Sequence, residues 1–157
     1  MKQDKFLIVI IITVIILMIV AVGVFSVRQN SQDYVNEDTP EGIVHNFVFA
    51  IQQDDFERAY SYLYEAEGKP TLSEFRQYYK SNNLVNIGAQ IQGSEIFDQP
   101  KGDPIAAVDL IVVRSSNEPF SGSSRYSDSV SLQFQNGEWK ITNFSYQLWF
   151  WDWYQEE

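Results

Sequence analysis

Residues 130–141, with the sequence VSLQFQNGEWKI, decide the fold class. Apolar and polar residues alternate before the central dipeptide, which is the period of a strand with one buried face. Asn136-Gly137 is a strong signal for a two-residue hairpin turn, and the alternation resumes after it. The alternating apolar residues are Val130, Leu132, Phe134, Trp139 and Ile141. This stretch therefore predicts an antiparallel hairpin near the C-terminus.

Two further strands are expected upstream of the hairpin. Residues 85–97 contain an alternating run, and residues 105–113 form a nearly continuous apolar run, as in a central strand covered on both faces. Residues 100–104 are rich in Pro and Gly and predict a turn between the two strands. Residues 115–128 are rich in Ser and Gly, and we expect a long loop there.

Helical signals come before all of these strands. Thr39-Pro40-Glu41 is typical of a helix start, with a capping Thr and Pro at the first helical position. Asp54 or Asp55 can cap a second, shorter helix, and Thr71-Leu72-Ser73-Glu74 is a capping-box pattern that opens a third. Helices followed by a run of strands indicate an α+β fold, with the helices on one face of an antiparallel sheet.

The N-terminal region contains an uncharged apolar segment, residues 6–27. At 1.5 Å per residue a helix of this length spans about 33 Å, enough to cross the hydrocarbon core of a bilayer. A cleaved signal peptide is the alternative, because Ala21-Val22-Gly23 resembles a cleavage site. The apolar core of a signal peptide is shorter, about 7–15 residues, so we expect an uncleaved membrane anchor.

Charges around this segment predict an orientation. Lys2 and Lys5 precede it and Arg28 follows closely, so the positive-inside rule keeps the N-terminus cytoplasmic and places the C-terminal domain outside the membrane. We expect three regions: residues 1–28 as cytoplasmic tip and anchor, residues 29–38 as a polar tether, and residues 39–157 as the folded domain.

The composition excludes several kinds of chemistry. The chain has no cysteine, which removes disulfides, thiolate nucleophiles and cysteine-ligated zinc. Its net charge is −10, and the part after residue 28 is more acidic still, so it repels nucleic acid. The single histidine, His45, lies beside the apolar stripe of the first domain helix and predicts no metal site. We expect no cofactor, and the sequence predicts no oligomeric state.

The domain resembles the nuclear transport factor 2-like superfamily, whose members pack N-terminal helices into a curved sheet that forms a cone. The resemblance rests on residues 39–41 at the first helix, on Asp55-Phe56-Glu57-Arg58-Ala59-Tyr60 with Leu63 in the second, and on residues 136–141 in the hairpin. It covers about residues 39–146. It implies a fold and leaves function open, because one fold hosts enzymes, binding modules and assembly proteins alike.

Enzymes of that superfamily often place an Asp, with a Tyr or His, inside the cone. The matching residue here is Asp109, and the resemblance implies that Tyr60 and Trp139 could line a pocket with it. A carboxylate buried there could act as a general base. The alternative follows from strand parity. The even positions from Ala106 to Val112 are uniformly apolar, so Asp109 would point outward while Tyr60 and Trp139 belong to the core.

The most unusual stretch is the C-terminal tail, residues 148–154, which holds Trp149, Trp151 and Trp153. These aromatic residues could cap the domain intramolecularly. They could also form a docking patch for a partner, because Trp and Tyr are frequent hot spots, or they could contact the membrane interface.

Two functions follow as hypotheses. The first is a non-enzymatic, membrane-anchored extracytoplasmic domain for protein interaction or assembly, with an envelope protein as partner. The second is a small-ligand-binding cone, or a cofactor-free isomerase or dehydratase-like enzyme that uses Asp109 and Tyr60.

Overall fold

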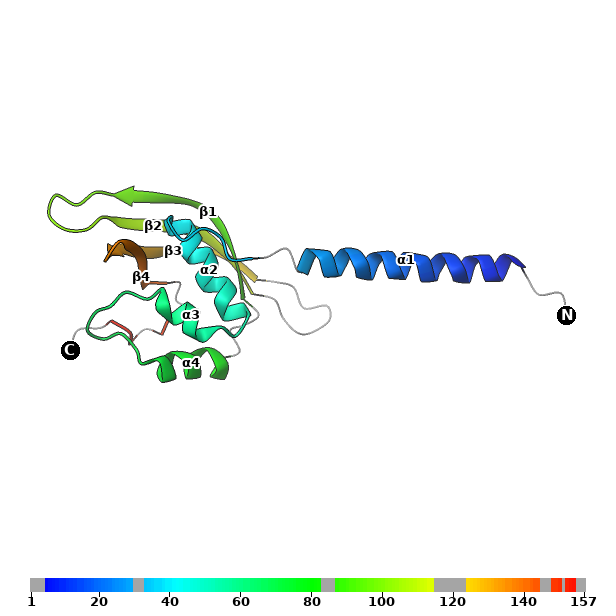
Figure 1. Cartoon of the computed structure of the whole chain (residues 1–157), viewed down its shortest axis with the longest axis horizontal. Helices are drawn as coiled ribbons and strands as arrows, with labels where there is room; N and C mark the ends of the chain where they lie inside the picture. Colours follow the sequence, from blue (N-terminus) through cyan, green and yellow to red (C-terminus); the bar gives the residue numbers. More distant parts are fainter. Residues whose placement is uncertain are drawn as a thin grey trace. The chain divides into compact units, whose positions relative to one another are not determined.

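A computed structural model describes residues 5–29, 33–82, 87–114, 124–144, 148–150 and 152–154. The chain divides into two compact units, Met1–Asp33 and Tyr34–Glu157. The first unit contains helix α1. The second contains three helices followed by four strands, and the helices lie on one side of the sheet (Figure 1).

Helix α1 runs without interruption over Lys5–Gln29. Its described side chains, residues 8–23, are all exposed and almost all apolar. Within the part of the chain that the structure describes, no helix meets the length and hydropathy required of a membrane span.

The three domain helices begin where their capping residues predict. They are α2 (Pro40–Gln52), α3 (Phe56–Ser61) and α4 (Leu72–Ser81). The Thr39 hydroxyl accepts a hydrogen bond from the Gly42 amide at 3.1 Å, and Asp55 accepts one from the amide of Arg58 at 3.2 Å. Thr71 and Glu74 form the expected capping box. All three predicted helix starts are confirmed.

The sheet is antiparallel with the strand order β1-β2-β3-β4. The strands are β1 (Ile87–Phe97), β2 (Ile105–Arg114), β3 (Ser124–Gln135) and β4 (Glu138–Asn143). The predicted hairpin turn is confirmed: Asn136 and Gly137 both have positive φ, at 55° and 91°. The predicted α+β class, with helices on an antiparallel sheet, is therefore correct.

One strand boundary differs from the sequence prediction. The expected loop of residues 115–128 ends earlier, because β3 already begins at Ser124 and Tyr126 pairs with Val112 of β2. The first half of β3 carries Ser127 and Ser129 on its exposed face, so it lacks the apolar alternation that would identify it as a strand.

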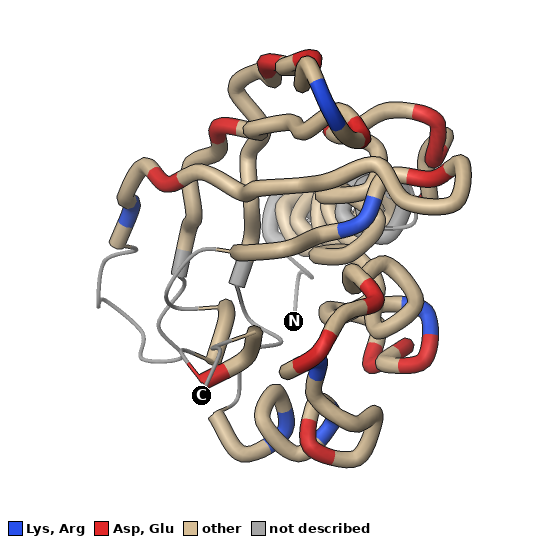
Figure 2. The backbone as a smooth tube through the Cα atoms, turned by 90° about the vertical axis from the view of Figure 1, so that its left-hand side faces the viewer, with Lys and Arg blue, Asp and Glu red and all other residues tan. Residues whose placement is uncertain are grey.

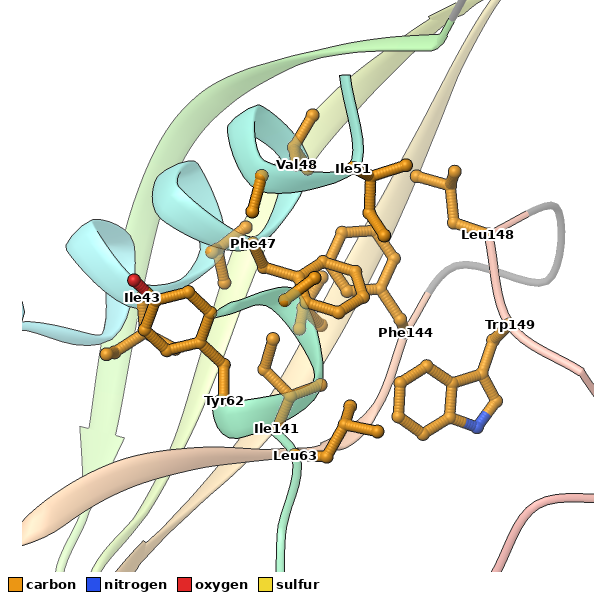
Figure 3. Packing of buried hydrophobic residues seen from close by; sticks show 14 of the residues in the cluster. Ile43, Phe47, Val48, Ile51, Tyr62, Leu63, Ile141, Phe144, Leu148 and Trp149 are labelled. Atoms are coloured by element: carbon orange, nitrogen blue, oxygen red, sulfur yellow. The ribbon is translucent and has the colours of Figure 1, made fainter. Parts of the chain in front are cut away.

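The core lies between α2 and the inner face of the sheet. Phe47 of α2 is fully buried and contacts the ring of Phe144 at 5.1 Å between centroids, and Ile43, Val48 and Ile51 extend the same stripe (Figure 3). The inner face of β2 contributes Ala106, Val108, Leu110 and Val112, all buried. The outer residues of β2 are half-buried or exposed, so the expected coverage of both faces is wrong for the described residues.

Candidate functional site

Residues 34–38, called the strap below, lie against the domain and are not a free linker. The buried side chain of Asn46 forms two hydrogen bonds with Val35: its Oδ1 accepts from the Val35 amide at 2.8 Å, and its Nδ2 donates to the Val35 carbonyl at 2.9 Å. The ring of Tyr34 packs edge-on against Phe49 at 4.9 Å. The expected tether of residues 29–38 is therefore shorter, and the compact unit begins at Tyr34.

Arg58 ties the strap to helix α3. Its Nη2 donates to Glu37 Oε1 at 2.9 Å, and its Nε donates to the Tyr62 hydroxyl at 2.9 Å. The same Glu37 oxygen accepts from the Tyr62 hydroxyl at 2.7 Å. The guanidinium lies 3.3 Å from the ring centroid of Tyr34, a cation–π geometry. Arg58 and Tyr62 of the domain therefore hold Glu37 of the strap by charge and hydrogen bonding, and Arg58 also packs on the ring of Tyr34.

These contacts shift the pKa values of the groups involved. Hydrogen bonds from Arg58 and then from Tyr62 lower the pKa of Glu37 below its ordinary value. The hydrogen bond to Glu37 is the main cause that raises the pKa of Arg58. Burial, followed by the hydrogen bond to Glu37, raises the pKa of Tyr62 to about 12. The ionised Glu37 and the neutral Tyr62 are thus the forms that fit the docked strap.

We expect the strap to loosen at low pH. Because the pKa of Glu37 is lower in the folded chain, its contribution to stability is present above the ordinary value of 4.5 and is lost as the pH falls below it. Arg58, Tyr62 and the more distant Lys140 are the groups that favour its ionised form. The measurement is the protection factor of the Val35 amide between pH 6 and pH 3.

The control for this measurement is Glu37→Gln. The variant should show weaker protection at pH 6 and a much flatter pH dependence. The effect should be modest, because the side chains of Arg58 and Glu37 are 39% and 48% exposed. An identical pH profile in the wild type and the variant would contradict the assignment to Glu37.

A hollow of about 630 Å³ opens beside the strap. Its walls come from the strap and the start of α2, from the end of α3, and from the β3–β4 hairpin. The lining residues are Glu37, Asp38, Ile43, Ser61, Tyr62, Phe134, Gly137, Glu138, Trp139 and Lys140. Trp139 and Tyr62 are almost fully buried, and the Phe134 ring meets Trp139 edge-on at 5.3 Å. The hollow therefore combines an aromatic floor with a charged rim.

The rim of the hollow has a net negative charge, because it carries three carboxylates and one ammonium group. Lys140 donates to Glu138 at 2.6 Å and to the Ser61 carbonyl at 2.9 Å, so its charge is engaged within the rim. The acidic character extends beyond the hollow, since Asp and Glu recur along the turns and helices with few basic residues between them (Figure 2). A ligand with a cationic part would meet a favourable field here.

The structure does not bring the three predicted pocket residues together. Trp139 lines the hollow. Tyr60 lies elsewhere: its hydroxyl donates to the Pro70 carbonyl at 2.7 Å, and the ammonium of Lys69 lies 4.1 Å from its ring centroid. Asp109 is exposed on the outer face of the sheet, where it pairs with Ser129. Strand alternation explains this placement, because the neighbours of Asp109 on β2, Val108 and Leu110, occupy the inner face.

The aromatic tail belongs to the core. Trp149 and Trp153 are 5% and 7% exposed and meet edge-on at 5.2 Å, and Trp153 also stacks on Phe75 of α4 at 5.6 Å. The buried hydroxyl of Tyr79 donates to the Leu148 carbonyl. Trp149 and Trp153 therefore pack against the domain as an intramolecular cap. Trp151 lies outside the described residues.

A glycine allows the tail to approach the helices closely. The Tyr154 amide donates to the Gly68 carbonyl at 3.0 Å, and the Tyr154 hydroxyl donates to the Tyr64 carbonyl at 2.6 Å. Gly68 has a φ of 78°, and a Cβ atom there would lie 2.9 Å from the Cα atom of Tyr154. Backbone contacts thus hold the tail in place in addition to its aromatic packing.

No family model and no curated protein matches the chain. Among solved structures, a SEC-C motif containing protein from Rhodopseudomonas palustris is similar with a TM-score of 0.50 and 13% identity, over 69% of this chain and 79% of that one. A putative calcium/calmodulin dependent protein kinase II association domain from Xanthomonas campestris has a TM-score of 0.47 and 10% identity, over 71% of this chain and 93% of that one. A protein of unknown function with a cystatin-like fold from Nostoc punctiforme has a TM-score of 0.42 and 17% identity, over 63% of this chain and 80% of that one. The first of these shows a shared fold and carries no information on function.

Most residues of the site carry no signal in the sequence that would identify them. Glu37 and Asp38 lie in a polar stretch without periodicity, which is typical of a linker. Asn46 gave a usable signal: it follows Ile43 by three residues on the buried stripe of α2, and a buried amide there needs a partner. Among the described residues, no group of three His, Cys, Asp or Glu side chains lies close enough to hold a metal ion.

Proposed function

We propose that the protein is a membrane-tethered, non-enzymatic binding domain that receives a protein partner in the hollow. Residues 6–27 of α1 anchor the chain, with the N-terminus cytoplasmic and the domain outside the cytoplasmic membrane. The partner is an envelope protein or a membrane neighbour. We further infer that the domain belongs to the nuclear transport factor 2-like superfamily, supported by the sequence patterns and by the arrangement of helices on the sheet.

One observation carries the proposal: the hollow is built partly from the strap, which lies close in sequence to the apolar segment. Only residues 28–33 separate that segment from Tyr34, a distance of at most about 25 Å when fully extended. Two residues of the strap, Glu37 and Asp38, line the hollow. A partner in the hollow would consequently be held near the membrane surface.

The anchor is supported by physical chemistry. The apolar segment has no charged residue and lies within one continuous helix, and its described side chains are exposed. A helix that is apolar on all sides is unfavourable in water and stable in the hydrocarbon core of a bilayer. The two polar side chains in the segment are Thr13 and Ser26, and Thr13 donates to the Val9 carbonyl at 2.9 Å.

A small ligand in the same hollow is the second candidate. The volume of about 630 Å³ lies within the usual range for small-molecule pockets, roughly 300–1,000 Å³, and aromatic walls are typical of them. The enzyme hypothesis is weaker, because Asp109 and Tyr60 lie on different parts of the molecule. The carboxyl of Glu37 and the ammonium of Lys140, which do lie at the hollow, are engaged with Arg58 and Glu138.

The outward position of Asp109 gives a simple prediction. Asp109→Asn should change the free energy of unfolding by less than about 0.5 kcal/mol and leave binding at the hollow intact, because exposed substitutions rarely do more. Val108→Asp, one position away on the inner face, should unfold the domain. Chemical denaturation of both variants checks this, and a large loss of stability in Asp109→Asn would contradict the exposed placement.

The proposed function is tested by photo-crosslinking in membranes. A benzoylphenylalanine replaces Ser61, an exposed residue of the hollow, or Ser129, an exposed residue of the outer sheet face. We expect a discrete protein adduct from position 61 and none from position 129. A mass increase of only a few hundred daltons at position 61 would favour the small ligand. No adduct, or the same pattern from both positions, would contradict the proposal.

A further inference from the structure

We propose that the strap is releasable, and that its docking both completes the hollow and sets how far the domain can extend from α1. The proposal rests on the proposed function only where it concerns the partner. Two features of α2 support it, since each is unfavourable for the helix alone and each is explained by the docked strap.

The first feature is Asn46. It is fully buried among apolar residues of α2, where an amide without partners would be costly. Both polar atoms of its side chain bond to the backbone of Val35, in the pattern by which two neighbouring strands pair, and Nδ2 also lies 3.5 Å from Glu37 Oε1. The amide thus recognises the backbone of the strap and requires no particular side chain at position 35.

The second feature is Gly42, in the first turn of α2. Glycine within a helix costs about 1 kcal/mol relative to alanine. A Cβ atom at this position would overlap the Asn36 carbonyl oxygen, which occupies the space that the missing side chain leaves. The strap therefore packs directly onto the helix, and only glycine permits this contact.

The contacts of the strap suit reversible docking. Residues 35–38 are exposed, and Val35, an apolar residue, is 45% exposed. The strap has no strand pairing, and its ion pair lies at the surface, where such pairs contribute little. Apart from the half-buried ring of Tyr34 and the hydrogen bonds between Val35 and Asn46, the strap makes few buried contacts, and such a segment opens locally at lower free energy than the whole domain.

Release would change both the hollow and the tether. Two of the three rim carboxylates, Glu37 and Asp38, would leave the hollow together with the hydrogen bond between Glu37 and Tyr62. The link to the domain would lengthen by five residues, or about 17 Å when extended. A partner that contacts Glu37 or Asp38 in the hollow would hold the strap in place. Because binding and docking are linked, release of the strap would in turn lower the affinity for that partner.

The test uses Gly42→Ala in the full chain in detergent micelles, with hydrogen exchange as the readout. This variant removes no hydrogen-bonding group and improves the helix propensity of α2, so loss of strap docking is not a consequence of a weaker helix. We expect exchange of the Val35 amide to become at least about tenfold faster while core amides of β2 keep their protection. Gly93→Ala is the control, because a Cβ atom there meets nothing within 4 Å.

Two exchange results would overturn the proposal. Unchanged exchange at Val35 would mean that Gly42 does not hold the strap. An equal increase at Val35 and in β2 would mean that the strap opens only with the whole domain, and Asn46→Leu should then give the same global pattern.

The photo-crosslink from position 61 provides a separate measurement. In Gly42→Ala its yield should fall several-fold, and an unchanged yield would contradict the coupling between strap and hollow. Absence of an adduct in the wild-type chain would count against the proposed function, and the exchange experiment would still decide whether the strap is releasable.

Discussion

Deletion of residues 148–157 is expected to unfold the domain. Among its described residues the tail supplies the buried side chains of Leu148, Trp149 and Trp153 to the core, and its Leu148 carbonyl accepts the hydrogen bond of the buried Tyr79. Loss of one buried Trp side chain costs about 3–5 kcal/mol, and a domain of this size is stable by only about 5–15 kcal/mol. Circular dichroism of the chain that lacks residues 148–157 should show loss of the cooperative unfolding transition.

Point variants keep this prediction testable if the deletion does not express. Trp153→Ala should lower the free energy of unfolding by about 3–5 kcal/mol, because its ring contacts Phe75, Tyr78 and Trp149. Asp152→Ala, at an exposed neighbouring position, should change it by less than about 0.5 kcal/mol. A truncated chain with the wild-type unfolding midpoint would contradict the assignment of the tail to the core.

The second large effect concerns the proposed anchor. Two arginines at the centre of the apolar segment, Ile16→Arg with Leu17→Arg, should remove most of the chain from the membrane fraction. Each charge at the centre of a helix costs about 2.5–3.5 kcal/mol on insertion scales, and the pair offsets most of the gain from the apolar side chains.

The matched control exchanges the same two residues, as Ile16→Leu with Leu17→Ile, and should leave the distribution unchanged. Membrane flotation measures both variants. Equal flotation of the arginine variant and the control would show that this segment does not hold the chain in the membrane.

The parts of the fold that could be predicted from sequence are those specified locally. The caps at Thr39, Asp55 and Thr71 act within one helical turn, and Asn136-Gly137 specifies its hairpin within four residues. Strand parity indicated the outward side of Asp109 for the same reason, since the alternation of β2 is contained in the strand itself.

The missing parts depend on contacts between distant segments. The strap is held by Asn46, eleven residues away, and by Arg58, twenty-one residues from Glu37. The tail packs on α4, and 69 residues separate Tyr79 from Leu148. No local pattern distinguishes a docked polar segment from a free one, so the strap was predicted to be a linker.

The hollow likewise combines a residue that the sequence pointed to with residues that distant segments bring together. The resemblance implied that Trp139 could line a pocket, and Trp139 does line the hollow. Its neighbours Glu37 and Asp38 come from the strap, and Tyr62 from the end of α3, so the site forms only when three separate segments meet. Tyr60 was grouped with Trp139 through the resemblance, whereas its hydroxyl is directed to the Pro70 carbonyl.

Accessibility of a single cysteine tests the central claim, a domain tethered outside the cytoplasmic membrane, most directly. The chain has no natural cysteine, so Ser129→Cys on the exposed face of β3 provides a unique thiol. We predict that a membrane-impermeant maleimide labels this thiol in intact cells as fully as after permeabilisation, while Lys2→Cys is labelled only after permeabilisation. Labelling of position 129 only after permeabilisation, or recovery of the chain outside the membrane fraction, would contradict the account.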